Sequence, residues 1–144
     1  MEGRLYRAAG IVIFRRLAGQ IQYLLLQASY GDHHWTPPKG FLDPGEDDFS
    51  AAVRETTEEA GYLEHDLRIF KDVNKTLEYE VRGKLKTVIY WLAELIDPQK
   101  PPTLSDEHQD YKWLPKDEAK VLAKYKLMAD LIDCFEEKIQ DQQK

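Results

Sequence analysis

The segment Ala28–Glu46 limits the fold of this chain more than any other feature, because three prolines and three glycines interrupt it. Proline lacks a backbone donor and clashes with the preceding helical turn, so no helix can run through this segment. Loops of this length inside a compact domain are usually functional. We therefore expect a long functional loop between two regions of regular secondary structure.

Strand-like segments precede this loop, and a helix follows it. Ala8–Phe14 and Gln20–Gln27 are apolar and flank a glycine-containing turn, which predicts a β-hairpin buried on both faces. Apolar and small residues then recur at helical spacing between Phe49 and Ala60, and Gly61 is suited to end that helix. These patterns predict a hairpin, a loop and an amphipathic helix, in that order.

The second half of the chain adds strands and then helices. Further strands are expected at Asp66–Val73, Asn74–Val81, Leu85–Leu95 and Asp110–Leu114, and one or two helices within Lys116–Lys138. Mixed strands with helices on both faces of the sheet give an α/β fold in α/β/α layers. For 144 residues we expect a single domain over residues 1–144, with a loose polar tail at residues 140–144.

Composition and charge argue against several classes of protein. The 26 acidic and 20 basic side chains give a net charge of −6, which disfavours a broad nucleic-acid or membrane-binding surface. The single cysteine, Cys134, rules out an intrachain disulfide. The apolar run Ala8–Phe14 is too short for a membrane helix, and Met1–Tyr6 does not resemble a signal peptide. We expect a cytoplasmic monomer, compatible also with the nucleus and without a membrane partner.

One face of the helix after the loop is acidic. Glu55, Glu58 and Glu59 lie at positions i, i+3 and i+4, so their carboxylates share one side of the helix. Like charges at these spacings destabilise an isolated helix by roughly 0.2–0.5 kcal/mol per pair, and only Arg54 is basic nearby. Spacing alone leaves two interpretations: a solvated acidic face, or a site for a hard divalent cation such as Mg²⁺ or Mn²⁺.

The residues around this acidic face form a longer pattern with fixed spacings, within residues 40–62. Its fixed positions are Gly40, Glu46, Arg54, Glu55, Thr57, Glu58, Glu59, Ala60 and Gly61. The pattern resembles the Nudix box, the signature of the Nudix hydrolases, and so many fixed positions leave little room for a chance match. The one departure is Thr56, where the family usually has an aliphatic residue, although a threonine methyl group can still pack.

The resemblance implies a Nudix-type α/β/α sandwich with a mixed sheet, and hydrolysis of a nucleoside diphosphate linked to another group. It further implies that Glu55, Glu58 and Glu59 bind Mg²⁺, for which Mn²⁺ can substitute, and that Arg54 orients one of these carboxylates. Glu46 would be a more distant structural acid. A divalent ion suits this chemistry because it neutralises polyphosphate charge and orients water for in-line attack.

The segments flanking the box resemble one branch of that family. Leu24–Gly40, Lys86–Leu95 and Leu104–Leu114 are similar to segments of the asymmetrical diadenosine tetraphosphate hydrolases of animals. Phe41 and Asp106 depart from this pattern, because histidine is usual at both places. The resemblance implies cleavage of diadenosine tetraphosphate into ATP and AMP.

A dinucleoside polyphosphate needs cations along its phosphates and an aromatic face for a base. The expected binding residues are Tyr30, His34, Lys39, Tyr79, Lys86 and Tyr125. The two lysines and His34 can donate hydrogen bonds to phosphate oxygens. By the resemblance, Tyr79 and Tyr125 surround an adenine and Tyr30 lies near the phosphates. The alternative for each tyrosine is a core position with a solvated hydroxyl group.

Glu107 is the acidic residue outside the box to which the resemblance gives a role. It implies that Glu107 approaches the metal ion, as a further ligand or as the general base. Whether Glu107 or Glu58 accepts a proton from water stays open. The neighbouring His108 is equally compatible with a surface position and with the site.

Two other functions stay open at this point. Within the hydrolases, the substrate could be a capped RNA end or a diphosphoinositol polyphosphate, although the latter favours more basic residues than this chain has. The domain could instead bind a nucleotide without cleaving it. Such a module would be free to lose its carboxylates, so the presence of Arg54, Glu55, Glu58 and Glu59 favours catalysis.

Overall fold

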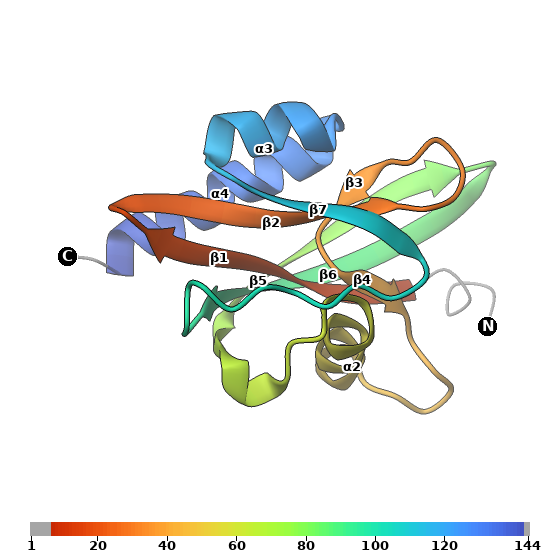
Figure 1. The fold of residues 1–144 in the computed structure, drawn as a ribbon. Coiled ribbons are helices and arrows are strands. Elements are labelled where there is room, and N and C mark those ends of the chain that lie inside the picture. The colour runs from red at the N-terminus through yellow and green to blue at the C-terminus, as the bar shows by residue number, and fades with distance from the viewer. Residues whose placement is uncertain (1–6, 143–144) are drawn as a thin grey trace.

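The computed structural model describes residues 7–142, in which a mixed seven-stranded sheet is flanked by helices (Figure 1). In chain order the elements are β1 (Arg7–Leu17), β2 (Gln20–Ala28), β3 (Trp35–Thr36), β4 (Lys39–Phe41), α2 (Asp48–Ala60), a 3₁₀ turn (Glu64–Asp66), β5 (Leu67–Val81), β6 (Lys84–Leu95), β7 (His108–Leu114), α3 (Lys116–Ala123) and α4 (Lys126–Gln142).

Strand β1 lies at the centre of the sheet. The strand order is β3-β2-β1-β6-β5, with β4 also paired to β1 and β7 also paired to β2. The β1–β6 pair is parallel, and the other pairs are antiparallel. Pairing with β1 brings β4, from the long loop, next to the first strand of the chain. The sheet therefore fixes the position of the residues that precede the acidic helix.

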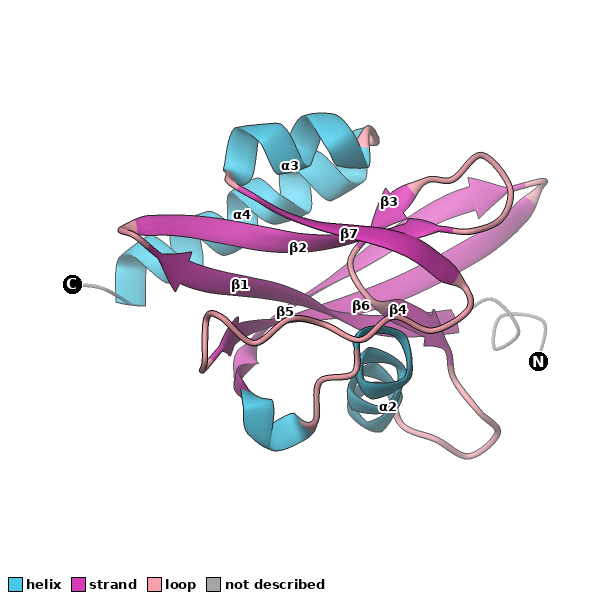
Figure 2. Ribbon diagram, in the orientation of Figure 1, coloured by secondary structure: helices cyan, strands magenta, loops and turns pink. Residues whose placement is uncertain are grey.

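Helices cover both faces of the sheet (Figures 1 and 2). Successive residues of a strand point to opposite faces, so Val12 packs with residues of α3 and α4, whereas Ile11 and Ile13 pack with residues of α2. Both faces of β1 are consequently buried, as its apolar run indicates. This arrangement confirms the expected α/β/α layers and mixed sheet.

Two expectations about the strands need correction. The segment expected as a loop contains the short strands β3 and β4, because the prolines lie between them, and the carbonyl of Pro38 accepts a hydrogen bond from Ile11 N at 3.2 Å. The strands expected at Asp66–Val73 and Asn74–Val81 form one strand, β5, whose register shifts between Phe70 and Asn74. This irregularity directs the carbonyl of Lys71 toward Trp91 Nε1, at 3.3 Å.

The tail expected to be loose at residues 140–144 is helical as far as Gln142, and residues 143–144 lie outside the described part. Ile139 remains buried and ties the last turns of α4 to the core. Within residues 7–142, no helix is both long and apolar enough to cross a membrane.

Candidate active site

The acidic helix α2 is well defined at both ends. The carboxylate of Asp47 accepts a hydrogen bond from Ser50 N at 2.7 Å, as an N-cap does. Gly61 ends the helix with φ of 76°, a conformation that favours glycine. The unusual Thr56 is buried, and its hydroxyl donates to the carbonyl of Ala52 at 2.7 Å, so this polar group is satisfied. Helix α2 can therefore carry its acidic residues in fixed positions.

Arg54 connects three carboxylates of the site. Its guanidinium donates to Glu46 at 2.8 and 2.9 Å, to Glu55 at 3.0 Å and to Glu58 at 3.1 Å. A further hydrogen bond, of 3.0 Å, reaches the carbonyl oxygen of Phe41 in β4. These contacts lower the pKa of Glu46 to about 2, chiefly through the hydrogen bonds from Arg54. Arg54 thus orients two of the expected metal ligands, Glu55 and Glu58, and joins helix α2 to strand β4.

The other two carboxylate contacts involve the backbone of β4. The backbone N–H of Lys39 donates to Glu59 Oε1 at 3.0 Å. Gly40 faces Glu55 so closely that a Cβ at this position would overlap the carboxylate. A side chain at position 40 would displace the carboxylate of Glu55, so glycine allows this carboxylate to lie against β4, a role separate from backbone flexibility.

Burial and mutual repulsion hold the site carboxylates in an unfavourable electrostatic environment. Burial raises the pKa of Glu55, and it raises the pKa of Glu59 to about 7, with additional contributions from the charges of Glu55 and Glu107. Glu58 differs from them because 55% of its side chain is exposed. The negative charges of Glu55, Glu59 and Glu107 therefore repel one another across the site.

Glu107 approaches the carboxylates of Glu55 and Glu59 from the loop before β7. Its carbonyl oxygen accepts a hydrogen bond from Ser29 N at 2.8 Å, and the carbonyl of Asp106 accepts one from Ser29 Oγ at 2.9 Å. These bonds attach the loop to the end of β2. His108 follows with a side chain only 7% exposed, and its Nε2 lies 4.0 Å from Glu59 Oε1.

His108 Nδ1 is buried and has no hydrogen-bond partner among the described residues. A buried polar atom of this kind is costly unless a further group completes its bonding. Burial also lowers the pKa of His108, which favours the neutral imidazole.

The donor set matches a hard divalent cation in chemistry. Carboxylate oxygens are the ligands that Mg²⁺ and Mn²⁺ prefer, and a cation would offset the repulsion that raises the pKa of Glu59. Within residues 7–142, no group of three or more histidine, cysteine or acidic side chains is already gathered closely enough to hold a metal ion. Arg54 holds the carboxylates of Glu55 and Glu58 by hydrogen bonds. The residues fit the ion, provided that these side chains turn toward it.

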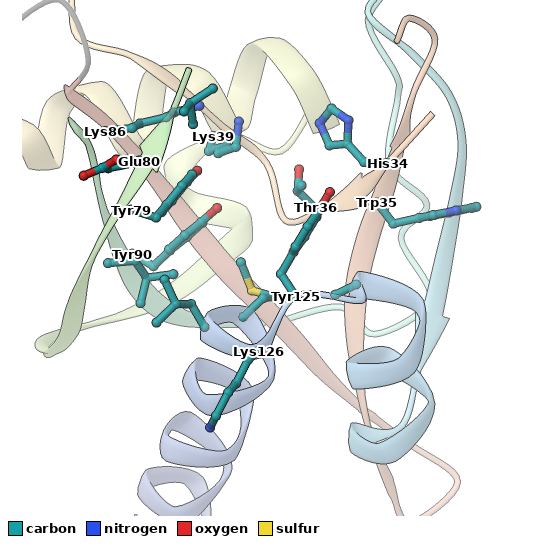
Figure 3. Close-up of a pocket in the computed structure, with 15 residues that line it drawn as sticks. His34, Trp35, Thr36, Lys39, Tyr79, Glu80, Lys86, Tyr90, Tyr125 and Lys126 are labelled. Carbon is teal, nitrogen blue, oxygen red and sulfur yellow. The ribbon is translucent and has the colours of Figure 1, made fainter. Parts of the chain in front are cut away.

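A cavity of about 620 Å³ lies on the face of the sheet covered by α4, and five of the six expected binding residues line it (Figure 3). They are His34, Lys39, Tyr79, Lys86 and Tyr125. Tyr30 is not part of the lining. Its ring contacts the ring of His34 at 5.9 Å, and the charges of Glu107 and Glu59 add to the effect of burial in raising its pKa. Tyr30 therefore lies near both His34 of the cavity and the carboxylates.

The cavity has an aromatic side and a cationic end. Tyr79 from β5 and Tyr125, between α3 and α4, both line it, and the Lys39 and Lys86 side chains lie together at one end (Figure 3). Burial and the nearby charge of Lys39 lower the pKa of Lys86 to about 8. The cavity can therefore accept a flat ring on one side and anionic groups at its cationic end.

Several residues of the cavity were missed in the sequence, among them Tyr90 and Lys126. Tyr90 is buried on the cavity wall, and the alternation of β6 would have placed it on the same face as Lys86. Lys126, the first residue of α4, also lines the cavity, but its position depends on a helix start that the sequence does not mark.

Comparison with known proteins identifies close relatives of this chain. A family model described as the NUDIX domain matches residues 4–134. A bis(5'-nucleosyl)-tetraphosphatase [asymmetrical] of Caenorhabditis elegans is 53% identical over 129 residues, covering 90% of this chain and 93% of the relative. The protein of the same name from Mus musculus is 51% identical over 128 residues, covering 85% and 87%.

Solved structures agree with the sequence relatives. A C. elegans Ap4A hydrolase in a binary complex superimposes with a TM-score of 0.92 at 50% identity, covering 94% of this chain and 98% of that one. The E. coli dihydroneopterin triphosphate pyrophosphohydrolase, at 22% identity and a TM-score of 0.76, shares the fold.

Proposed function

The chain belongs to the Nudix family, and from this premise we propose that it hydrolyses diadenosine tetraphosphate to ATP and AMP with Mg²⁺ as its metal ion. The observation that carries this proposal is that one residue, Lys39, connects the cavity with the carboxylates. Lys39 lines the cavity with its side chain and donates its backbone N–H to Glu59. The relatives at about half identity, named as asymmetrical tetraphosphatases, support the same substrate.

The carboxylates would hold the metal ion. Glu55, Glu58 and Glu59 from α2 and Glu107 from the loop before β7 supply the oxygen donors, and Arg54 positions two of them. A divalent ion, when bound, neutralises phosphate charge and makes a phosphorus atom more susceptible to attack by water. Glu58 or Glu107 then accepts the proton that the attacking water loses.

The cavity residues would bind one half of the substrate. An adenine stacks between Tyr79 and Tyr125, which both line the cavity and influence each other electrostatically. Lys39, Lys86 and His34 donate to the phosphates that leave the cavity, because all three line it and the two lysines lie together at one end (Figure 3). Tyr30, next to His34, contacts the phosphates closest to the carboxylates.

A substrate comparison tests this proposal against its rivals. The purified protein is incubated with Mg²⁺ and, separately, with diadenosine tetraphosphate, a capped RNA oligonucleotide and a diphosphoinositol polyphosphate, each with a parallel sample containing excess chelator. We expect diadenosine tetraphosphate to have the highest kcat/KM, and hydrolysis to stop in the chelator. A higher kcat/KM for another substrate would replace the proposed one, and tight binding without hydrolysis would show a binding module.

A further inference from the structure

Phe41 is an exposed aromatic residue at the end of the strand that carries Lys39. It is 50% exposed, and its ring centroid lies 5.1 Å from Lys86 Nζ. The same ammonium group lies 6.0 Å from the ring centroid of Tyr79 in the cavity. One cation therefore lies near both the exposed ring and the aromatic wall of the cavity, so the two aromatic surfaces are neighbours.

Strand β4 holds this ring in a fixed place beside the carboxylates. Phe41 pairs with Ala8 of β1, and its carbonyl oxygen accepts the 3.0 Å hydrogen bond from Arg54. Residues two apart on a strand share a face, so Phe41 lies on the face of Lys39, while Gly40 between them faces the carboxylate of Glu55. Three consecutive residues thus present a cation, a contact with the carboxylates and an exposed ring.

The exposed aromatic residues of the described chain are Tyr30, Phe41 and Tyr125. Tyr125 lines the cavity, and Tyr30 packs against His34. Phe41 is not part of the cavity lining, although its ring centroid lies 5.1 Å from Lys86 Nζ. The cavity, at about 620 Å³, has the size of a site for one small ligand and aromatic walls for one base. A dinucleoside polyphosphate has a second base, for which a further aromatic surface is needed once Tyr79 and Tyr125 hold the first.

We propose that Phe41 is the stacking surface for this second base, the one that remains outside the cavity. The inference rests on the proposed function. Phosphates that pass Lys39 and Lys86 and then approach Glu55 follow β4 along its length, and they deliver the second nucleoside next to Phe41. Stacking on an aromatic ring tolerates any base, because every base has a π-face, so this contact selects for a dinucleotide and against a mononucleotide.

Two substrates that differ by one nucleoside separate this role from a structural one. Diadenosine tetraphosphate and adenosine 5'-tetraphosphate share one adenosine and four phosphates, and only the former has a second base. We measure kcat/KM for both with the unaltered protein, Phe41→Ala and Phe41→Trp. The control variant is Leu85→Ala, because Leu85 is 56% exposed and adjoins Lys86 on the opposite face of β6.

The ratio of kcat/KM for diadenosine tetraphosphate to that for adenosine 5'-tetraphosphate decides between a stacking role and a structural role of Phe41. We expect Phe41→Ala to lower the preference for diadenosine tetraphosphate by roughly 5- to 100-fold, Phe41→Trp to retain it, and Leu85→Ala to leave it unchanged. If Phe41 only supports Lys86, both substrates lose equally, the ratio stays constant, and the proposal is overturned. If the unaltered protein cleaves neither substrate, the proposed function fails first, and this outcome is distinct from a constant ratio.

Discussion

Titration of Lys86 should control how well the protein uses a polyphosphate substrate between pH 7 and pH 9.5. Burial, together with the charge of Lys39, lowers the pKa of Lys86 to about 8. The charged ammonium is therefore present below this pH and is lost as the pH rises through it. The other titratable groups that line the same cavity are His34, Lys39, Tyr79, Glu80, Tyr90, Tyr125 and Lys126.

The size of the effect follows from the pKa of about 8. About nine in ten molecules carry the Lys86 charge at pH 7 and about three in a hundred at pH 9.5, a ratio of roughly 30. A hydrogen bond to a charged group contributes about 1.5–3 kcal/mol, or roughly 10- to 150-fold in binding. We therefore expect kcat/KM for diadenosine tetraphosphate to fall by about 10- to 30-fold over this range.

The assay is a pH profile of kcat/KM for the unaltered protein, Lys86→Arg and Lys86→Met. Arginine keeps its charge throughout this range, so Lys86→Arg should show little of the decline. The kcat/KM of Lys86→Met should be low at pH 7 and should change little as the pH rises. An equal decline in the unaltered protein and in Lys86→Arg would refute the reasoning, because another group would then be the one that titrates.

Three further substitutions test other parts of the site and the fold. Glu58→Gln removes a charge at nearly constant shape and should lower kcat on the order of 100-fold or more. The control variant, Glu137→Gln at an exposed acid in α4, should leave kcat unchanged. Near-normal turnover of Glu58→Gln would contradict the role of Glu58 as a metal ligand. Gly40→Ala should weaken Mn²⁺ binding measured by calorimetry, since its Cβ displaces a carboxylate of α2, and unchanged affinity would place the metal elsewhere. Tyr62→Phe removes the 2.6 Å hydrogen bond to the carbonyl of Lys100 and should lower Tm by roughly 2–4 °C at full activity.

The helix and its acidic face could be predicted from the sequence because their signals are local. The spacing of Glu55, Glu58 and Glu59, with Gly61 at the helix end, depends only on helical geometry. The layers of the fold were predictable for the same reason, since the continuous apolar run of β1 requires cover on both faces.

Contacts made by the backbone and between distant segments could not be predicted in this way. The hydrogen bond from Lys39 to Glu59 uses the backbone N–H, which every residue except proline has, so no sequence pattern predicts it. The position of Lys86 near both Phe41 and Tyr79 depends on the pairing of four strands, β4, β1, β6 and β5. The register shift that joins two expected strands into β5 is likewise a property of the assembled sheet.

The most direct test of the central claim is the identity of the products. Diadenosine tetraphosphate is incubated with the protein and Mg²⁺, and the products are separated by ion-exchange chromatography beside a chelated sample. The account predicts ATP and AMP in equal amounts, and neither in the chelated sample. Two molecules of ADP per substrate, or no product from folded protein with Mg²⁺ present, would contradict it.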